Sequence, residues 1–127
     1  MIQCDALVAG AGPAGAIVAL ELARAGLRVA IADGSDVRLK LGESLPGVGL
    51  RLLRMLGIDD SDFGRVHRSF GGNLSCWGFE FLEADDFLRD PDGPSWRLSR
   101  RHFDASLLTG ACFAGVRHIR SKMLFAS

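Results

Sequence analysis

The stretch that decides the fold is residues 4–35, CDALVAGAGPAGAIVALELARAGLRVAIADGS, in which two apolar runs flank a turn of glycine, alanine and one proline. Residues 4–9 are short, apolar and bounded by glycine, which is typical of a buried parallel strand. Residues 13–25 carry apolar side chains at helical spacing, and Gly26 ends the predicted helix. Residues 27–32 read as a second strand. The order strand, turn, helix, strand predicts a βαβ unit.

The glycines of the turn have the spacing GxGxxG, at Gly10, Gly12 and Gly15. Gly10 permits a tight turn out of the strand, Gly12 lets a pyrophosphate approach the backbone, and Gly15 lets the helix pack closely on the sheet. The first helical residues, Pro13 and Ala14, lie where free N–H groups and the helix dipole face an anion. The pattern predicts a dinucleotide phosphate site. The alternative is a tight strand–helix turn that binds nothing.

Asp33 follows the second strand, 23 residues after Gly10. A carboxylate at this place accepts hydrogen bonds from both hydroxyls of an adenosine ribose, and it repels a 2′-phosphate, which argues against NADP here. The alternative for Asp33 is a solvated acid in a loop.

The bulk composition excludes several classes of protein. The 127 residues suit one domain, and the 15 basic residues balance 15 acidic ones, so no strong field points to nucleic acid or to an anionic membrane. The apolar run of residues 6–20 contains glycine and proline and is followed by Glu21, so it is too short for a membrane span. The distant cysteines Cys4, Cys76 and Cys112 indicate reduced thiols, no metal site and a cytoplasmic protein.

The residues after Asp33 favour FAD over NAD. An NAD dehydrogenase usually continues with another helix and a third parallel strand. Here a polar loop follows, Pro46 and Gly47 break the chain, and apolar residues from Leu50 predict a short helix that ends at Gly57.

The chain resembles FAD-dependent monooxygenases and halogenase-like flavoproteins, whose fold is that of p-hydroxybenzoate hydroxylase and geranylgeranyl reductase. The resemblance rests on four motifs in order, GAGPAGAIVALELARAGLRVAIAD, GESLP, SCWG and GPSWRLSRRHFDASLL. It covers residues 4 to about 115. It implies an α/β protein with a Rossmann-like FAD-binding βαβ unit and parallel sheet, followed by the start of an inserted β-rich substrate region.

The resemblance also implies roles for single residues. Gly10, Gly12 and Gly15 cradle the FAD pyrophosphate, and Asp33 holds the ribose, where the family usually has the longer Glu. The loop with Glu43 and Ser44 runs beside the flavin, or else these two residues cap the next helix.

Arg100 matches the family's arginine, three residues before Phe103 and Asp104, and opens a helix directed at the pyrophosphate. Its planar fork suits two phosphate oxygens. The preceding Ser99 stands where the family often has Asp, which removes a charge partner. The alternative is a surface arginine, the role expected for Arg97 and Arg101.

The middle segment contains fewer motifs. A short helix is expected within residues 59–67, and a turn at RDPDGPSW. Residues 71–83, GGNLSCWGFEFLE, are expected to form a strand in which Trp77, Phe79 and Phe81 alternate. Core packing is the favoured role of Trp77 and Trp96, with contact to substrate or flavin as the alternative.

Halogenation is disfavoured, because tryptophan halogenases carry a catalytic lysine after the GE-type loop and this stretch reads RVHRSFGG. His67 in that stretch is expected to be exposed and solvated, with a role as an acid–base group as the alternative.

The main hypothesis is the FAD-binding N-terminal part of a flavin-dependent oxidoreductase, a monooxygenase acting on a small organic substrate, with NAD(P)H as transient reductant. The expected parts are residues 1–58 (βαβ unit and GES loop), 59–98 (β-rich insert) and 99–127 (helix and strand returning to the FAD domain). Because the family's proteins are longer, we expect a truncated product or a fragment. The alternatives are a catalytically inactive nucleotide-binding fragment and an NAD-dependent dehydrogenase fragment. The catalytic residues and the oligomeric state stay open.

Overall fold

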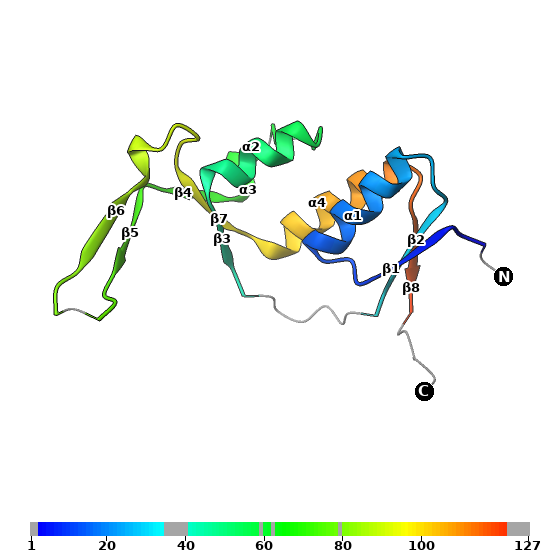
Figure 1. Cartoon of the computed structure of the whole chain (residues 1–127), viewed down its shortest axis with the longest axis horizontal. Coiled ribbons are helices and arrows are strands. Elements are labelled where there is room, and N and C mark those ends of the chain that lie inside the picture. The colour runs from blue at the N-terminus through cyan, green and yellow to red at the C-terminus, as the bar shows by residue number, and fades with distance from the viewer. Residues whose placement is uncertain (1–2, 35–40, 59, 62, 79, 122–127) are drawn as a thin grey trace. The chain divides into compact units, whose positions relative to one another are not determined.

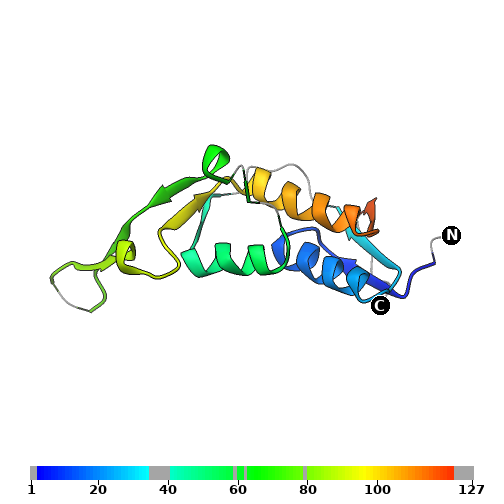
Figure 2. The same ribbon diagram turned by 90° about the horizontal axis from the view of Figure 1, so that it is seen from above.

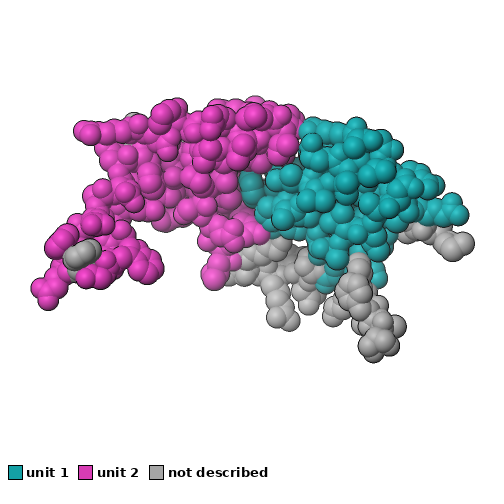
Figure 3. Space-filling model, viewed as in Figure 1, with its two compact units in different colours: residues 1–40, 101–127 teal, residues 41–100 magenta. Residues whose placement is uncertain are grey.

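The computed structural model describes residues 3–34, 41–58, 60–61, 63–78 and 80–121 (Figure 1). The chain divides into two compact units (Figure 3). Unit 1 is Met1–Lys40 with Arg101–Ser127, and unit 2 is Leu41–Arg100.

Unit 1 is built on a parallel sheet of three strands in the order β1-β2-β8. The strands are β1 (Ala6–Ala9), β2 (Val29–Asp33) and β8 (Arg117–Arg120). Helix α1 (Pro13–Arg24) connects β1 to β2, and helix α4 (Arg100–Phe113) precedes β8. Both helices lie on the same side of the sheet (Figures 1 and 2). Right-handed crossovers between successive parallel strands require this arrangement. The predicted βαβ unit and parallel sheet are confirmed.

The core of unit 1 lies between these helices and the sheet. Register pairs Val8 with Ile31 and Ile31 with His118, so these three side chains share a face. Ile31 and Leu107 are fully buried. The small or apolar residues around them, also buried, are Ala16, Ala19, Leu20, Val29, Phe103, Ala111 and Val116. Alanines at the α1 contact let the helix lie close to the strands.

An ion pair fixes β2 beside the start of β1. The carboxylate of Asp5 accepts from the Arg28 backbone N–H at 2.8 Å, from Nε at 3.0 Å and from Nη2 at 2.7 Å. The side-chain hydrogen bond from Arg28, followed by its backbone N–H, lowers the pKa of Asp5 from 3.8 to about 2. Asp5 is therefore ionised down to low pH in the folded chain.

Unit 2 contains an antiparallel sheet in the order β3-β7-β4, with strands β3 (Glu43–Leu45), β7 (Ser95–Leu98) and β4 (Arg68–Phe70). Two helices accompany it, α2 (Gly47–Met55) and the single turn α3 (Phe63–Val66). The helix predicted from Leu50 is present and begins three residues earlier, at Gly47. The short helix expected within residues 59–67 is also present.

Helix α2 fits closely against the turn before β7. A Cβ added to Gly47 would lie 2.6 Å from the carbonyl oxygens of Asp92 and Gly93, so only glycine fits there. Arg51 Nε lies 3.0 Å from Asp92 Oδ1 and joins the same two elements. The Asp92 N–H donates to Asp90 Oδ1 at 2.9 Å, an Asx turn that confirms the turn predicted at RDPDGPSW.

A hairpin of β5 (Gly72–Ser75) and β6 (Glu83–Asp86) leads into a 3₁₀ turn, η1 (Phe87–Arg89). The strand expected over residues 71–83 is present in its first part, as β5. Its continuation through Trp77 and Phe81 is wrong, because residues 76–78 and 80–82 lie in the hairpin's connection. Phe79 lies outside the described residues. Core packing is also wrong for Trp77, which is 84% exposed. Alternating aromatic residues bury a strand face only where a second layer covers it.

No helix in the described part of the chain is both long and apolar enough to cross a membrane.

Candidate cofactor-binding site

The turn after β1 gives each glycine a different geometry. Gly10 has φ of 94°, a conformation that favours glycine, and its N–H donates to the Ala32 carbonyl at 2.7 Å. A Cβ on Gly15 would lie 2.0 Å from the Gly10 carbonyl oxygen and 3.4 Å from Val8 Cγ1. Gly15 therefore permits the close contact between α1 and the end of β1. The positions of these two glycines agree with the mechanical roles expected from the spacing.

Gly12 combines open space with an ordinary backbone conformation. A Cβ added there meets nothing within 4 Å, as at Gly10 and unlike Gly15, but its φ is −72°. It is the N-cap residue of α1 in extended backbone, and it supplies no side-chain cap. Pro13 begins the helix, and the first turn's bond runs from the Ala16 N–H to the Gly12 carbonyl at 2.9 Å. Helix geometry leaves the N–H groups of Ala14 and Gly15 without an intrahelical acceptor. Open space in front of free N–H groups and a positive dipole end suits a phosphate.

Asp33 lies at the same edge of the sheet as the glycine turn. Asp33 is the last residue of β2. The hydrogen bond from the Gly10 N–H to the carbonyl of Ala32, the residue before Asp33, places the glycine turn next to it. The carboxyl ends of parallel strands meet at one edge, which is where α/β proteins bind nucleotides. Asp33 is partly buried. This placement fits a ribose acid, and the role itself stays a prediction.

Two further predicted residues meet in unit 2, although 57 positions separate them. Arg100 Nη1 donates to Glu43 Oε1, with the Arg100 side chain only 14% exposed and Glu43 62% exposed. Glu43 thus orients Arg100. Its carboxylate pairs with the guanidinium in place of the Asp that the family often has at the position of Ser99. The capping alternative for Glu43 and Ser44 is wrong, because both lie in β3 and the N-cap of α2 is Pro46, without a side-chain cap.

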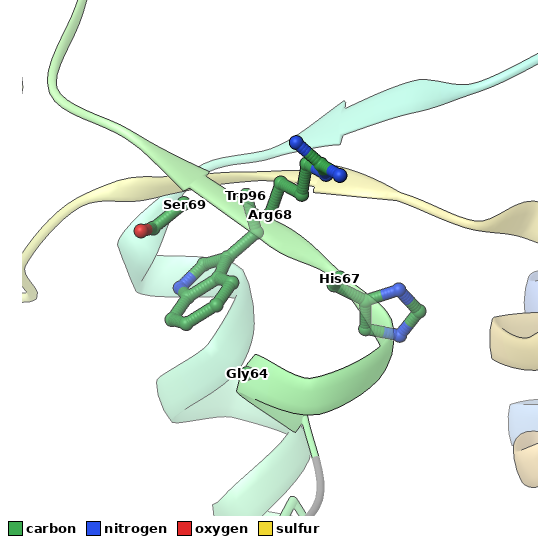
Figure 4. A pocket seen from close by; sticks show the side chains of 5 residues that line it. All are labelled: Gly64, His67, Arg68, Ser69 and Trp96. Atoms are coloured by element: carbon green, nitrogen blue, oxygen red, sulfur yellow. The ribbon is translucent and has the colours of Figure 1, made fainter.

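A pocket of about 360 Å³ lies beside α3 and β4, lined by Gly64, His67, Arg68, Ser69 and Trp96 (Figure 4). His67 is only 7% exposed, so the expectation of a solvated histidine is wrong. Its Nδ1 accepts the Ser99 N–H at 3.1 Å, and its ring lies edge-on to Phe63 at 4.2 Å.

The neutral tautomer of His67 follows from this bond. Because Nδ1 accepts, the proton lies on Nε2, which is then a donor. Phe63 also contacts Trp96, with the two ring centroids 5.2 Å apart and the rings edge-on. Phe63 and His67 are four residues apart, a helical spacing that could have indicated the burial. The pocket itself could not be predicted, because the Ser99 N–H that His67 accepts lies 32 positions further along the chain.

The parallel sheet, glycine turn and terminal acid define a dinucleotide-binding α/β protein. Residues 3–94 match the family described as FAD binding domain, and the chain belongs to that family. FAD is its cofactor, and the open turn at Gly12 fits the pyrophosphate of that group. Among the residues that the structure describes, no group of His, Cys, Asp and Glu side chains could hold a metal ion.

Known relatives include flavin-dependent halogenases. The flavin-dependent halogenase gsfI of Penicillium aethiopicum is 32% identical in an alignment of 123 residues that covers 91% of this chain and 22% of that protein. The myxobacterial chondrochloren halogenase CndH, described as a variant of FAD-dependent halogenases, has 30% identity and a TM-score of 0.77 over 91% of this chain and 28% of that one.

A monooxygenase shares the fold. PqsL, a probable FAD-dependent monooxygenase from Pseudomonas aeruginosa, has a TM-score of 0.71 over 91% of this chain and 32% of that one, with 20% identity. The chain therefore corresponds to the N-terminal FAD-binding part of these proteins and spans between a fifth and a third of their length.

Proposed function

We propose that this chain supplies the FAD-binding part of a flavin-dependent oxidoreductase that oxidises a small organic substrate, as a monooxygenase does. The observation that carries the proposal is the turn at Gly12, where open space faces the N-terminus of α1. In the proposal Gly10, Gly12, Pro13, Ala14 and Gly15 form the pyrophosphate site.

The other residues of the proposed site grip the rest of the cofactor. Asp33 accepts from the ribose hydroxyls, Arg100 binds a phosphate, and Glu43 orients Arg100 while Ser44 lies beside the flavin. FAD supplies the redox chemistry when bound, with NAD(P)H as transient reductant. The protein's contribution is binding, orientation and exclusion of water.

Halogenation is the second candidate, because gsfI and CndH carry that name. The lysines of this chain are Lys40 and Lys122, and neither falls in residues 65–72, where a halogenase-type lysine is expected. We therefore place hydroxylation first. A cytoplasmic setting belongs to the same proposal and is supported by the free thiols of Cys4, Cys76 and Cys112.

Titration of the purified chain with FAD, followed by quenching of flavin fluorescence, tests the cofactor. We expect saturable binding of FAD and weaker binding of NAD. Equal affinity for both would favour the dehydrogenase alternative, and binding of neither would favour an inactive fragment.

Product analysis separates the two activities. The FAD-loaded protein is incubated with NADH, oxygen and an electron-rich aromatic compound, with and without bromide. In the proposal the chain supplies only the FAD-binding part, so we expect no coupled product from it alone, and any product that forms should contain added oxygen under both conditions. A product that contains bromine would overturn the preference for hydroxylation.

A further inference from the structure

The antiparallel sheet of unit 2 lines up three polar side chains across its strands. Register pairs Ser44 with Arg97 and Arg97 with Arg68, so one residue of each strand stands in a single row. Directly paired residues of antiparallel strands share a face. The next row, with Leu45, Trp96 and Ser69, occupies the opposite face. Figure 4 shows Arg68 leaving β4 on the side away from the Trp96 indole. The Ser44–Arg97–Arg68 row is thus a polar strip of one hydroxyl and two guanidinium groups.

The two arginines of this row repel each other, and this repulsion lowers the stability of the sheet. Side chains directly opposite in an antiparallel pair have Cβ atoms about 5 Å apart, and like charges at that separation destabilise a sheet. Arg68 and Arg97 are both exposed, and neither has an ion-pair partner among the described residues. Other arginines of unit 2 are paired with carboxylates, as in Arg51–Asp92, Arg54–Asp60, Arg89–Asp86 and Arg100–Glu43.

The same face offers an apolar neighbour. Phe70 lies two residues after Arg68 on β4 and pairs with the buried Ser95, so it shares the face of the arginines. Its ring lies edge-on to Phe87 at 5.9 Å. Two residues along a strand separate side chains by about 6.5–7 Å. A ligand with an anionic group and an aromatic ring could therefore place the anion at the arginines and the ring against Phe70.

We propose that the Ser44–Arg97–Arg68 row binds the carboxylate or phosphate group of the organic substrate, with the apolar part of that substrate directed toward Phe70. A planar guanidinium grips two oxygens at once, and an anion between two of them turns repulsion into attraction. Assignment of the anion to a substrate rests on the proposed function, in which Ser44 lies beside the flavin. Glu43, the partner of Arg100, alternates with Ser44 and belongs to the opposite face.

Titration with benzoate, phenyl phosphate and the neutral benzamide, followed by backbone and arginine Nε–H NMR signals, tests the row. The variants are Arg68→Gln, Arg97→Gln and, as a matched control, Arg89→Gln, an exposed arginine of the same unit. We expect saturable binding of benzoate or phenyl phosphate but not of benzamide. Each row variant should bind the anion about tenfold more weakly, as for the loss of one charged hydrogen-bond partner. Arg89→Gln should bind it as the parent does.

FAD titration of the same variants separates this inference from the proposed function. We expect Arg68→Gln and Arg97→Gln to bind FAD with the parent's affinity, and to unfold at the same or a higher temperature because the repulsion is relieved. Equal loss of anion binding in Arg89→Gln would show mere attraction to positive charge and would overturn the proposal. A parallel loss of FAD affinity in the row variants would assign the row to the cofactor instead. Absence of FAD binding by the parent would reject the proposed function, whereas anion binding would still report on the row.

Discussion

Gly12 and Gly15 are three residues apart, and the structure gives them opposite surroundings. Space is open at Gly12, whereas backbone lies 2.0 Å from a Cβ at Gly15. The first glycine is therefore free to serve a ligand, and the second is needed by the fold. Substitution at the two positions should separate binding from stability.

Gly12→Val should abolish FAD binding and leave the free energy of unfolding within about 0.5 kcal/mol of the parent's, because the side chain enters only the space reserved for phosphate. Gly15→Ala should instead cost about 1–3 kcal/mol of stability through overpacking. FAD fluorescence titration and urea unfolding of both variants check this. Undiminished FAD affinity in Gly12→Val would place the phosphate elsewhere.

Arg100 tests whether fork geometry or charge alone matters. Arg100→Lys keeps the charge but replaces a planar fork with a point donor, so FAD should bind about tenfold more weakly, a loss of ~1.4 kcal/mol. Arg101→Lys, one position along α4 on an exposed residue, is the matched control and should change little. Flavin fluorescence titration measures both affinities. Similar effects at the two positions would remove Arg100 from the proposed site.

At the scale of elements, local patterns were the predictable part. The helix from Pro13 and the two strands around it follow from periodicity and glycine punctuation within 30 residues, and the structure has all three. Strands β3 and β4 have three residues each and exist through pairing with β7, which is far away in sequence. A local stretch of sequence cannot reveal these pairings, because the partner strand lies far away along the chain.

The site follows the same division. The glycine turn and Asp33 are separated only by α1 and β2, and the hydrogen bond from Gly10 to Ala32 shows that they lie close together. The Glu43–Arg100 pair and the hydrogen bond from the Ser99 N–H to His67 are contacts across more than thirty positions. These contacts could not be predicted before the β3-β7-β4 sheet was known.

The contact between the starts of β1 and β2 gives a prediction on pH. Because the pKa of Asp5 is lowered from 3.8 to about 2 in the folded chain, its stabilising contribution is complete above about pH 4 and is lost as pH falls to about 2. Asp5→Asn should therefore flatten the decline of unfolding free energy across that window. Urea unfolding at a series of pH values measures the slope.

The Arg28→Gln background is the control for this prediction, since Arg28 is the main cause of the shift. Asp5→Asn in that background should change the slope much less. An NMR titration that found the Asp5 carboxyl near pKa 3.8 in the parent would contradict the assignment.

At the scale of the whole molecule, the glycine turn and Asp33 belong to unit 1, whereas Arg100 and Glu43 belong to unit 2. Unit 1 thus holds the glycine turn and Asp33, which in the proposal bind the pyrophosphate and the adenosine ribose of FAD. A ligand that binds only the folded chain stabilises it by about 2.7 kcal/mol at a hundred times its Kd. ADP alone should therefore raise the Tm by several degrees, and riboflavin, which lacks the ADP half of FAD, should not.

Thermal unfolding with ADP, NAD, FAD and riboflavin checks this. NAD contains the same ADP half, so it should match ADP, and FAD should give an equal shift at a lower concentration because the flavin half adds contacts. Gly12→Val is the control and should lose the shift with every nucleotide while keeping the Tm of the free chain, since its Cβ meets open space. Stabilisation by riboflavin without stabilisation by ADP would mean that the glycine turn does not anchor the cofactor.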